Sequence, residues 1–227
     1  MPTVWFIRHG ESEANAGLPT IDPSMTPITT KGEWQAQQVA QAFTHTPDLI
    51  VTSPYHRTQQ TAQPTCLRFP NVPQAEWPVQ EFTYLAAARY QGSTIEHRLP
   101  LSDAYWQQND PFHVDGVGAE SFADLLTRVA VTQTKLIQLE KEFVAVFSHG
   151  RFIRAFVWAI LTRSTEANPK RMRQFQSLIT AFSVPNGSIL KLSVQNSEIW
   201  FNGIYTDHLS DPSLGKVVRA VDSSAVG

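Results

Sequence analysis

Disulfide bonds within the chain are excluded, because its 227 residues include a single cysteine, Cys66. Such low cysteine usage is typical of a protein that works in a reducing compartment. Cys66 lies in a segment with a helical pattern, away from the two His-Gly pairs of the chain. We therefore interpret it as a small packing residue and not as a nucleophile.

A large excess of one charge and long apolar runs are also absent. Lysine and arginine number 18 against 20 acidic residues, and this balance predicts no general attraction to nucleic acid or to an anionic membrane. The longest obvious apolar run, Ala155 to Leu161, is far too short to cross a bilayer. The apolar segment that starts at Val4 has no basic or apolar leader before it, so we expect a cytoplasmic protein.

No low-complexity linker divides the chain, and hydrophobic residues make up 42% of it against 17% charged residues. This composition is typical of a globular protein, and the length suits one large domain or two small ones. We predict a single domain over residues 1–227, in which residues 206–227 form a loosely docked tail.

Two apolar segments each end in a His-Gly pair. Val4 to Ile7 is followed by Arg8-His9-Gly10, and Phe143 to Phe147 is followed by Ser148-His149-Gly150. Short apolar runs rich in β-formers predict strands buried on both faces, and ligands of open α/β sheets bind at the carboxyl ends of such strands. We predict that His9 and His149 face each other across one cleft. A lone histidine after a strand is, however, more often an ordinary loop residue.

A third apolar segment, Leu49 to Thr52, is followed by Ser53-Pro54, a pair that predicts a helix beginning there. Arg57 then falls in the first helical turn, where the positive end of the helix dipole attracts anions. On its own, an arginine at such a position is usually a solvated side chain.

Two motifs of the chain resemble those of the histidine phosphatase superfamily, also called the phosphoglycerate mutase-like family. Arg8 to Asn15 reads Arg-His-Gly-Glu-Ser-Glu-Ala-Asn, and Ser53 to Ala62 reads Ser-Pro-Tyr-His-Arg-Thr-Gln-Gln-Thr-Ala; His149 matches the family's second histidine. The resemblance implies an α/β fold, a single three-layer domain whose mixed, mostly parallel sheet is flanked by helices. It also implies phosphoryl transfer without a metal or any other cofactor.

The resemblance assigns a role to each matching residue. His9 is the nucleophile that forms a phosphohistidine, His149 assists catalysis, and the transferred phosphoryl group is bound by Arg8, Asn15, Arg57 and His149. A neutral imidazole suits this chemistry, since a phosphate monoester carries about two negative charges and repels anionic nucleophiles. Judged from the residues alone, Asn15 is equally well a helix-ending asparagine.

Val79 to Phe82 predicts a short strand that ends beside a carboxylate, Glu81. The residues alone do not distinguish Glu81 from an ordinary surface glutamate. The resemblance identifies it as the proton donor, with Glu76 as the less favoured alternative. A general acid at this position would protonate the leaving oxygen and then activate water.

Residues 82–118 are irregular and predict a cap inserted over the site. From Glu81 to Glu120 there are six acidic residues and two arginines, whereas substrates with several phosphates would favour a basic cap. The segment also contains aromatic residues, which indicate either an apolar or aromatic leaving group or a small core of the cap itself: Tyr84, Tyr90, Tyr105, Trp106 and Phe112. This cap favours the phosphatase branch over a glycolytic mutase.

The remaining segments are expected to form helices and strands that support the site. One helix is expected to start at Thr30, which forms a capping box with Glu33. Further helices are expected after Ser121, over Phe152 to Leu161 and near Asn168-Pro169. Arg151 either leans toward the phosphate or remains in solvent. An antiparallel meander is expected from three segments joined partly by Asn186-Gly187, namely Ala181 to Val184, Ser188 to Val194 and Ile199 to Ile204.

The expected activity is hydrolysis of a small-molecule phosphate ester. No nucleic acid or membrane partner is expected, and the sequence leaves open whether the protein forms a homodimer. Three alternatives remain. A cofactor-dependent phosphoglycerate mutase would share the same core residues, and a silent phosphate-binding module would need neither nucleophile nor acid. A metal site of His9, His149 and Glu81 is the third, and the neighbouring arginines disfavour it.

Overall fold

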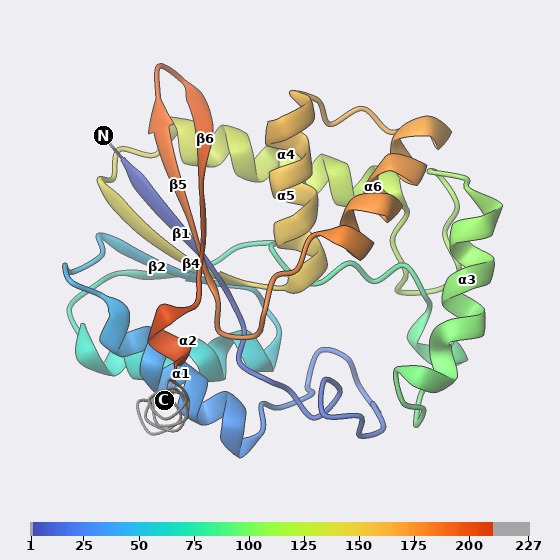
Figure 1. Ribbon diagram of the computed structural model, residues 1–227, viewed down its shortest axis with the longest axis horizontal. Coiled ribbons are helices and arrows are strands. Elements are labelled where there is room, and N and C mark those ends of the chain that lie inside the picture. Colours follow the sequence, from blue (N-terminus) through green and yellow to red (C-terminus); the bar gives the residue numbers. More distant parts are fainter. Residues whose placement is uncertain (1, 211–227) are drawn as a thin grey trace, which may run out of the picture.

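The computed structural model describes residues 2–210, which form an α/β domain built on one sheet (Figure 1). Within that range the sheet has six strands in the order β3-β2-β4-β1-β5-β6. The strands are β1 (Thr3–Arg8), β2 (Leu49–Thr52), β3 (Gln74–Glu76), β4 (Phe143–Ser148), β5 (Ile189–Gln195) and β6 (Glu198–Tyr205). The first four strands of this order pair in parallel, and β5 and β6 are antiparallel, so the mixed, mostly parallel sheet predicted from the sequence is confirmed.

Helices cover both faces of the sheet (Figure 1). On one face lie α1 (Thr30–Ala42) and α2 (His56–Arg68), and on the other lie α4 (Phe122–Gln138) and α5 (Gly150–Thr162). Alternate residues of β1 therefore pack in opposite directions: Trp5 and Ile7 join the core beneath α1 and α2, while Val4 and Phe6 join the core beneath α4 and α5. Burial on both faces explains the continuous apolar run in this strand.

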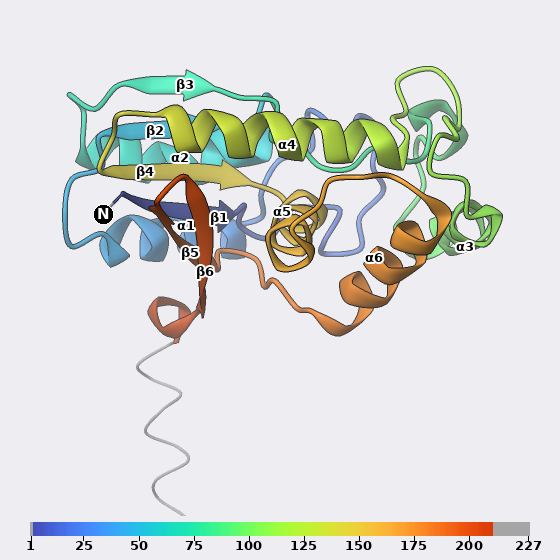
Figure 2. The same cartoon turned by 90° about the horizontal axis from the view of Figure 1, so that it is seen from above.

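The register of the two central strands brings the His-Gly pairs together. Arg8 of β1 pairs with Ser148 of β4, so the next residue of each strand, His9 or His149, emerges at the same level. In Figure 2 the arrows of β1, β3 and β4 point toward the side where α3 (Leu99–Gln108) and α6 (Pro169–Ala181) lie. The carboxyl ends of the strands therefore face the cap.

Two predicted helix starts are displaced. The helix expected from Ser53-Pro54 begins at His56 with Tyr55 as its N-cap; the hydroxyl oxygen of Ser53 accepts the backbone N–H of Tyr55 at 3.2 Å and also contacts Nε2 of His149. In α1 the N-cap is Thr29, whose side chain accepts the N–H of Gly32, and the capping box predicted at Thr30 is wrong. A capping box is present at the start of α4, between Ser121 and Asp124.

Two predicted strands are wrong. Val79 to Phe82 is irregular, and the third strand is Gln74–Glu76, which pairs with β2 before Pro78. Ala181 to Val184 is not a strand either, because α6 continues to Ala181. The meander is therefore a β5–β6 hairpin, turned by two residues at positive φ, Asn196 (51°) and Ser197 (61°).

Residues 82–118 leave the sheet and form the green right-hand edge of Figure 1, with α3 and the short helices η1 (Ala87–Arg89) and η2 (Glu96–Arg98). Five of the six phenylalanine, tyrosine and tryptophan residues of this cap are buried, and Phe112 is exposed. The ring centroids of Tyr84 and Tyr105 lie 4.9 Å apart, so the cap has a small aromatic core of its own.

Of the predicted tail, the structure describes the short helix η3 (Asp207–Leu209), and residues 211–227 lie outside the described range. His208 contacts the carbonyl oxygen of Gly187 through Nε2 at 2.9 Å, which docks η3 on the turn before β5. No helix among residues 2–210 is long and apolar enough to span a membrane.

Candidate active site

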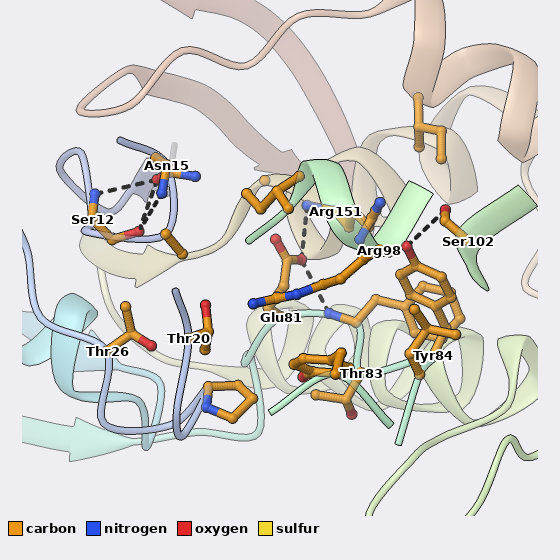
Figure 3. Close-up of a pocket in the computed structure, with 18 of the residues that line it drawn as sticks. Ser12, Asn15, Thr20, Thr26, Glu81, Thr83, Tyr84, Arg98, Ser102 and Arg151 are labelled. Atoms are coloured by element: carbon orange, nitrogen blue, oxygen red, sulfur yellow. Dashed lines mark hydrogen bonds between the residues drawn. The ribbon is translucent and has the colours of Figure 1, made fainter. Parts of the chain in front are cut away.

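A cavity of about 520 Å³ lies at the carboxyl ends of the strands. Its wall is built from the end of β1, the first turns of α2 and α5, the cap and α6. In Figure 3, Ser12 and Asn15 lie on one side of the cavity, Tyr84 and Ser102 on the other, and Glu81 between them. Residues far apart in the sequence therefore share one wall, as the two motifs predicted.

The partners of His9 fix the protonation of its ring. Nδ1 lies 2.7 Å from the carbonyl oxygen of Gly10, which can only accept, so Nδ1 carries the proton. Nε2 accepts a hydrogen bond of 3.2 Å from Nε of Arg57, which can only donate. Burial of the ring, followed by the positive charges of Arg57 and Arg8, holds the pKa of His9 well below its usual value. His9 is thus a neutral imidazole whose Nε2 lone pair faces Arg57.

The loop that carries His9 is clamped between α1 and α2. The backbone N–H of Gly10 donates to the hydroxyl of Thr61 at 3.0 Å. A Cβ at Gly10 would lie 2.5 Å from the carbonyl oxygen of Gly32, so only glycine permits this approach to α1. The close packing holds the His9 backbone in one position.

His149 lies beside His9, with ring centroids 5.1 Å apart, and is fully buried. Its Nε2 is 2.7 Å from the hydroxyl oxygen of Ser53, which lies 2.9 Å from that of Thr58. Because Thr58 donates its single hydroxyl proton to the carbonyl oxygen of Tyr55, Ser53 donates to Thr58 and accepts from Nε2 of His149. Nδ1 of His149 then has a lone pair, and it is buried without a partner among the described residues. The ring does not line the cavity.

Arg8 and Arg57 place two positive charges at the base of the cavity. Nη1 of Arg8 donates to the carbonyl oxygen of Val184 at 2.5 Å, while its Nε is buried without a partner in the described part of the chain. Nη1 of Arg57 donates to the carbonyl oxygen of Pro23 at 2.6 Å. Burial lowers the pKa of Arg57, and it lowers that of Arg8 to about 10, which leaves Arg8 charged at neutral pH. Within residues 2–210 neither arginine forms an ion pair, which favours an anion at this position.

Glu81 reaches the cavity from an irregular segment and not from a strand. Its Oε1 accepts backbone N–H groups of Phe82 at 3.0 Å and, at the start of α5, of Arg151 at 2.9 Å and Phe152 at 3.3 Å. Oε2 makes no hydrogen bond with any described residue. Glu76, the alternative proton donor, is exposed in β3 and does not line the cavity.

Asn15 also lines the cavity, and its side-chain oxygen is already engaged. Oδ1 accepts from the backbone N–H of Ser12 at 3.3 Å, from its hydroxyl at 3.1 Å and from Nδ2 of Asn186 at 3.0 Å. The Nδ2 group of Asn15 has no partner among residues 2–210, so it can donate to a bound anion.

Asn186 is a residue that the sequence did not single out beyond its turn. Its Nδ2 donates to the carbonyl oxygen of His9 at 3.0 Å and contacts Oδ1 of Asn15, so it ties the first motif to the segment before β5. Only an Asn-Gly pair marked this position, and such a pair is typical of any turn. Ser53 was likewise interpreted as a helix cap, and no signal in the local sequence marks its contact with His149.

The charge of the cavity differs from the charge of the cap segment. Among the described residues, five arginines line the cavity together with the carboxylates of Glu81 and Asp103; the arginines are Arg8, Arg57, Arg98, Arg151 and Arg154. Glu120 is paired with Arg128 at 2.6 Å and Asp115 with Arg89, so both acids are neutralised by arginines, and neither lines the cavity. The acidic balance of the segment therefore does not describe the cavity, which is strongly positive.

Comparisons with known proteins agree with this architecture. A phosphoserine phosphatase from Entamoeba histolytica, solved with 3-phosphoglyceric acid, superposes with a TM-score of 0.67 at 23% identity, covering 92% of this chain and 100% of its own. The alpha-ribazole phosphatase of Shigella flexneri superposes with a TM-score of 0.69 at 20% identity, covering 90% and 96%. At these identities the two likenesses show the fold.

The sequence comparisons give a local match and a family match. The probable phosphoglycerate mutase GpmB of Cronobacter sakazakii is 44% identical over 68 residues, a stretch that spans only 30% of that protein and 28% of this chain. The model of the histidine phosphatase superfamily (branch 1) matches residues 4–201, from the first strand to the last. This chain therefore belongs to the histidine phosphatase superfamily, as its two motifs indicated.

Proposed function

We propose that the protein is a phosphatase that hydrolyses small phosphate monoesters through a phosphohistidine on His9, without a metal. The observation that carries this proposal is the fixed tautomer of His9, with Nδ1–H on the Gly10 carbonyl and an Nε2 lone pair at the cavity. A neutral nitrogen can attack a dianionic phosphate without charge repulsion. In the first step the bond from Nε2 to phosphorus forms while the bond from phosphorus to the leaving oxygen breaks.

Phosphoryl transfer spreads negative charge over the equatorial oxygens, and fixed cations and N–H donors stabilise it. Arg8 and Arg57 supply uncompensated charge, and the unpartnered Nε of Arg8 supplies a free donor. The Nδ2 group of Asn15 is a further donor. His149 contributes once Nδ1 takes up a proton, which a bound dianion favours.

Glu81 is the proposed general acid and base. Three backbone N–H groups hold Oε1, so Oε2 carries the proton that passes to the leaving oxygen. In the second step the carboxylate takes a proton from water, the water oxygen bonds to phosphorus, and the bond from Nε2 to phosphorus breaks. His9 and the protonated Glu81 are then restored, and phosphate leaves.

Two features support a reaction without a metal. The described residues contain no group of three histidine, cysteine or acidic side chains arranged to hold a metal ion. The five arginines that line the cavity would also repel a cation.

Phosphoglycerate mutase activity is the second candidate, because of the 44% identity to a probable phosphoglycerate mutase over 68 residues. A mutase would return the phosphoryl group from His9 to a second oxygen of the substrate and exclude water. The positive cavity removes the charge argument against such a substrate that the cap sequence had offered. Assay of the isomerisation of 3-phosphoglycerate, with 2,3-bisphosphoglycerate present, separates the two candidates.

Hydrolysis of p-nitrophenyl phosphate in excess EDTA tests the proposed function. We expect turnover by the wild type and by His45→Ala, a control at an exposed histidine, and none by His9→Ala. Quenching with alkaline detergent during turnover of an ester with a radiolabelled phosphoryl group should trap a base-stable, acid-labile phosphoenzyme in the wild type and in His45→Ala but not in His9→Ala. Turnover by His9→Ala would overturn the role of His9, and loss of wild-type activity in EDTA would overturn the metal-free route.

A further inference from the structure

Three arginines besides Arg8 and Arg57 line the cavity, and each has guanidinium N–H groups without a partner among the described residues. Arg154 belongs with the phosphate site, because its Nη1 and the Nε of Arg8 lie 3.1 Å and 3.2 Å from the same point, a Cβ built on Gly150. We propose that the other two, Arg98 and Arg151, form a second anion site that binds a carboxylate or second phosphate on the leaving group. This inference rests on the proposed function, since it needs an ester bound through Arg8 and Arg57.

Arg151 is positioned without using its guanidinium hydrogen bonds. Its backbone N–H binds Glu81, and its Cζ lies 4.5 Å from the centroid of the Tyr84 ring, a stacked arrangement that leaves the N–H groups at the guanidinium edge free. The guanidinium makes no hydrogen bond or ion pair with a residue of the described chain. Tyr84 is itself held by a 2.9 Å hydrogen bond from its hydroxyl to Ser102, so Arg151 rests on a fixed surface (Figure 3).

Arg98 reaches the cavity from the cap and is held by its neighbours. Nε donates to the hydroxyl of Ser93 at 3.2 Å, Nη2 donates to the Ser93 carbonyl oxygen at 2.7 Å, and Cζ lies 4.2 Å from the Tyr90 ring centroid. That carbonyl oxygen also accepts the N–H of Thr20, which anchors Ser93 to the loop after β1. Nη1 of Arg98 has no partner among residues 2–210, and no described carboxylate pairs with it.

The position of this pair assigns the second anion to the leaving group. The backbone nitrogen of Arg151 lies 2.9 Å from Oε1 of Glu81, the carboxyl proposed to protonate the leaving oxygen, and the Arg151 guanidinium extends from there over the Tyr84 ring. Figure 3 shows Arg98 and Arg151 between Glu81 and Tyr84, with Ser12 and Asn15 on the far side of Glu81. An ester that spans the cavity therefore has its phosphoryl group beside His9 and its second anion beyond Glu81. Because both guanidinium groups are already held in place, binding requires little further ordering.

The experiment compares matched esters. Phenyl phosphates with a carboxylate at ring position 3 or 4 are compared with the corresponding neutral carboxamides, and benzene bisphosphates replace the carboxylate by a second phosphate. The quantity measured is the ratio of kcat/KM for the anionic ester to that for its neutral partner. Arg151→Gln and Arg98→Gln remove one cation each, Arg151→Lys keeps the charge, and Lys170→Gln, at an exposed residue outside the cavity, controls for net charge.

In the wild type we expect at least one anionic ester to exceed its neutral partner by about tenfold, the effect of one good charged hydrogen bond. Each glutamine variant should remove most of this ratio, Arg151→Lys should retain part of it, and Lys170→Gln should leave it unchanged. Whether the carboxylate esters or the bisphosphates give the higher ratio identifies the anionic group that the site binds. Ratios near one in every pair, or a preference that survives in both glutamine variants, would overturn the second site.

A binding measurement separates failure of the second site from failure of the proposed function. Calorimetric titration of the same esters into His9→Ala requires no turnover. If the wild type hydrolyses none of the esters, but the anionic esters bind more tightly than their neutral partners, the phosphatase activity is rejected and the second anion site is retained. Hydrolysis of all esters with equal binding in each pair would reject the site and retain the phosphatase.

Discussion

Nε of Arg57 donates a hydrogen bond to Nε2 of His9 over 3.2 Å. A cation that can only donate disfavours protonation of the same nitrogen, so Arg57 contributes to the low pKa of His9. When a phosphate ester binds, the guanidinium is already close enough to transfer its hydrogen bonds to the phosphoryl oxygens. Protonation of the proposed nucleophile and binding of the anion are therefore coupled through one side chain.

Replacing Arg57 should affect both functions at once. We expect Arg57→Ala to lower kcat/KM by about 10²- to 10³-fold and to weaken inhibition by vanadate. Because the positive charge is lost, the pKa of His9 should rise, and the acidic limb of the kcat/KM profile should move to higher pH. Arg57→Lys serves as the control that keeps the charge. Unchanged vanadate inhibition would show that Arg57 does not contact the phosphoryl group.

Substitution of Glu81 should discriminate between leaving groups. In Glu81→Gln the carbonyl oxygen can still accept the three backbone N–H groups, but no proton is available for the leaving oxygen. We expect alkyl phosphates to be hydrolysed about 10²-fold more slowly, and p-nitrophenyl phosphate, with its good leaving group, to lose much less. Equal slowing of both substrates would remove Glu81 from the acid role.

Binding of a dianion should protonate His149. Its Nε2 donates to Ser53 and its Nδ1 has no partner among the described residues, so a dianion bound beside the neighbouring His9 favours uptake of a proton at Nδ1. Calorimetry of sulfate binding, in buffers of differing ionisation enthalpy, should show uptake of about one proton near pH 7 by the wild type and none by His149→Gln. Sulfate binding without proton uptake by the wild type would contradict this assignment.

Asn186 is expected to act through its neighbours as a positioning residue. Asn186→Ala removes the hydrogen bonds to the His9 carbonyl and to Asn15, and we expect kcat to fall about tenfold with little change in KM. Asn186→Asp, which keeps the size but removes the donor, should resemble it. A loss confined to thermal stability, with kcat intact, would assign Asn186 to the scaffold alone.

The buried histidines should make folding sensitive to acid. The pKa values of folded His9 and His149 lie well below 6.5, whereas the unfolded chain binds protons near that value. Below pH 6.5 the unfolded state therefore binds more protons, and the free energy of unfolding falls as pH falls. Each histidine should contribute a slope of about 1.4 kcal/mol per pH unit between its two pKa values. Denaturant unfolding at pH 7 and 5.5 should show a smaller decrease for His149→Gln than for the wild type; an equal decrease would exclude His149 as a source.

Local patterns in the sequence were sufficient to place the two motifs at the ends of strands, whereas the roles of their residues came from the family resemblance. Apolar runs buried on both faces predicted β1, β2 and β4, and a polar motif after each run predicted that His9, Arg57 and His149 would meet at the same end of the sheet. Parallel pairing makes this inference safe, because it aligns the carboxyl ends of neighbouring strands. The family resemblance added Glu81, which local pattern could not distinguish.

Tertiary structure decided the contacts that cross between segments. Whether Ser53 caps a helix or binds His149 depends on the position of β4, which lies 90 residues further along the chain and is invisible in the local sequence. The charge of the cavity likewise depends on which side chains point inward, and ion pairs such as that of Arg128 and Glu120 withdraw acids from it. Composition counts charges along the chain, whereas electrostatic energy depends on distance and burial. The sequence by itself thus determined the family, the sheet and the positions of the two histidines; the protonation of those histidines and the positive cavity were decided by packing alone.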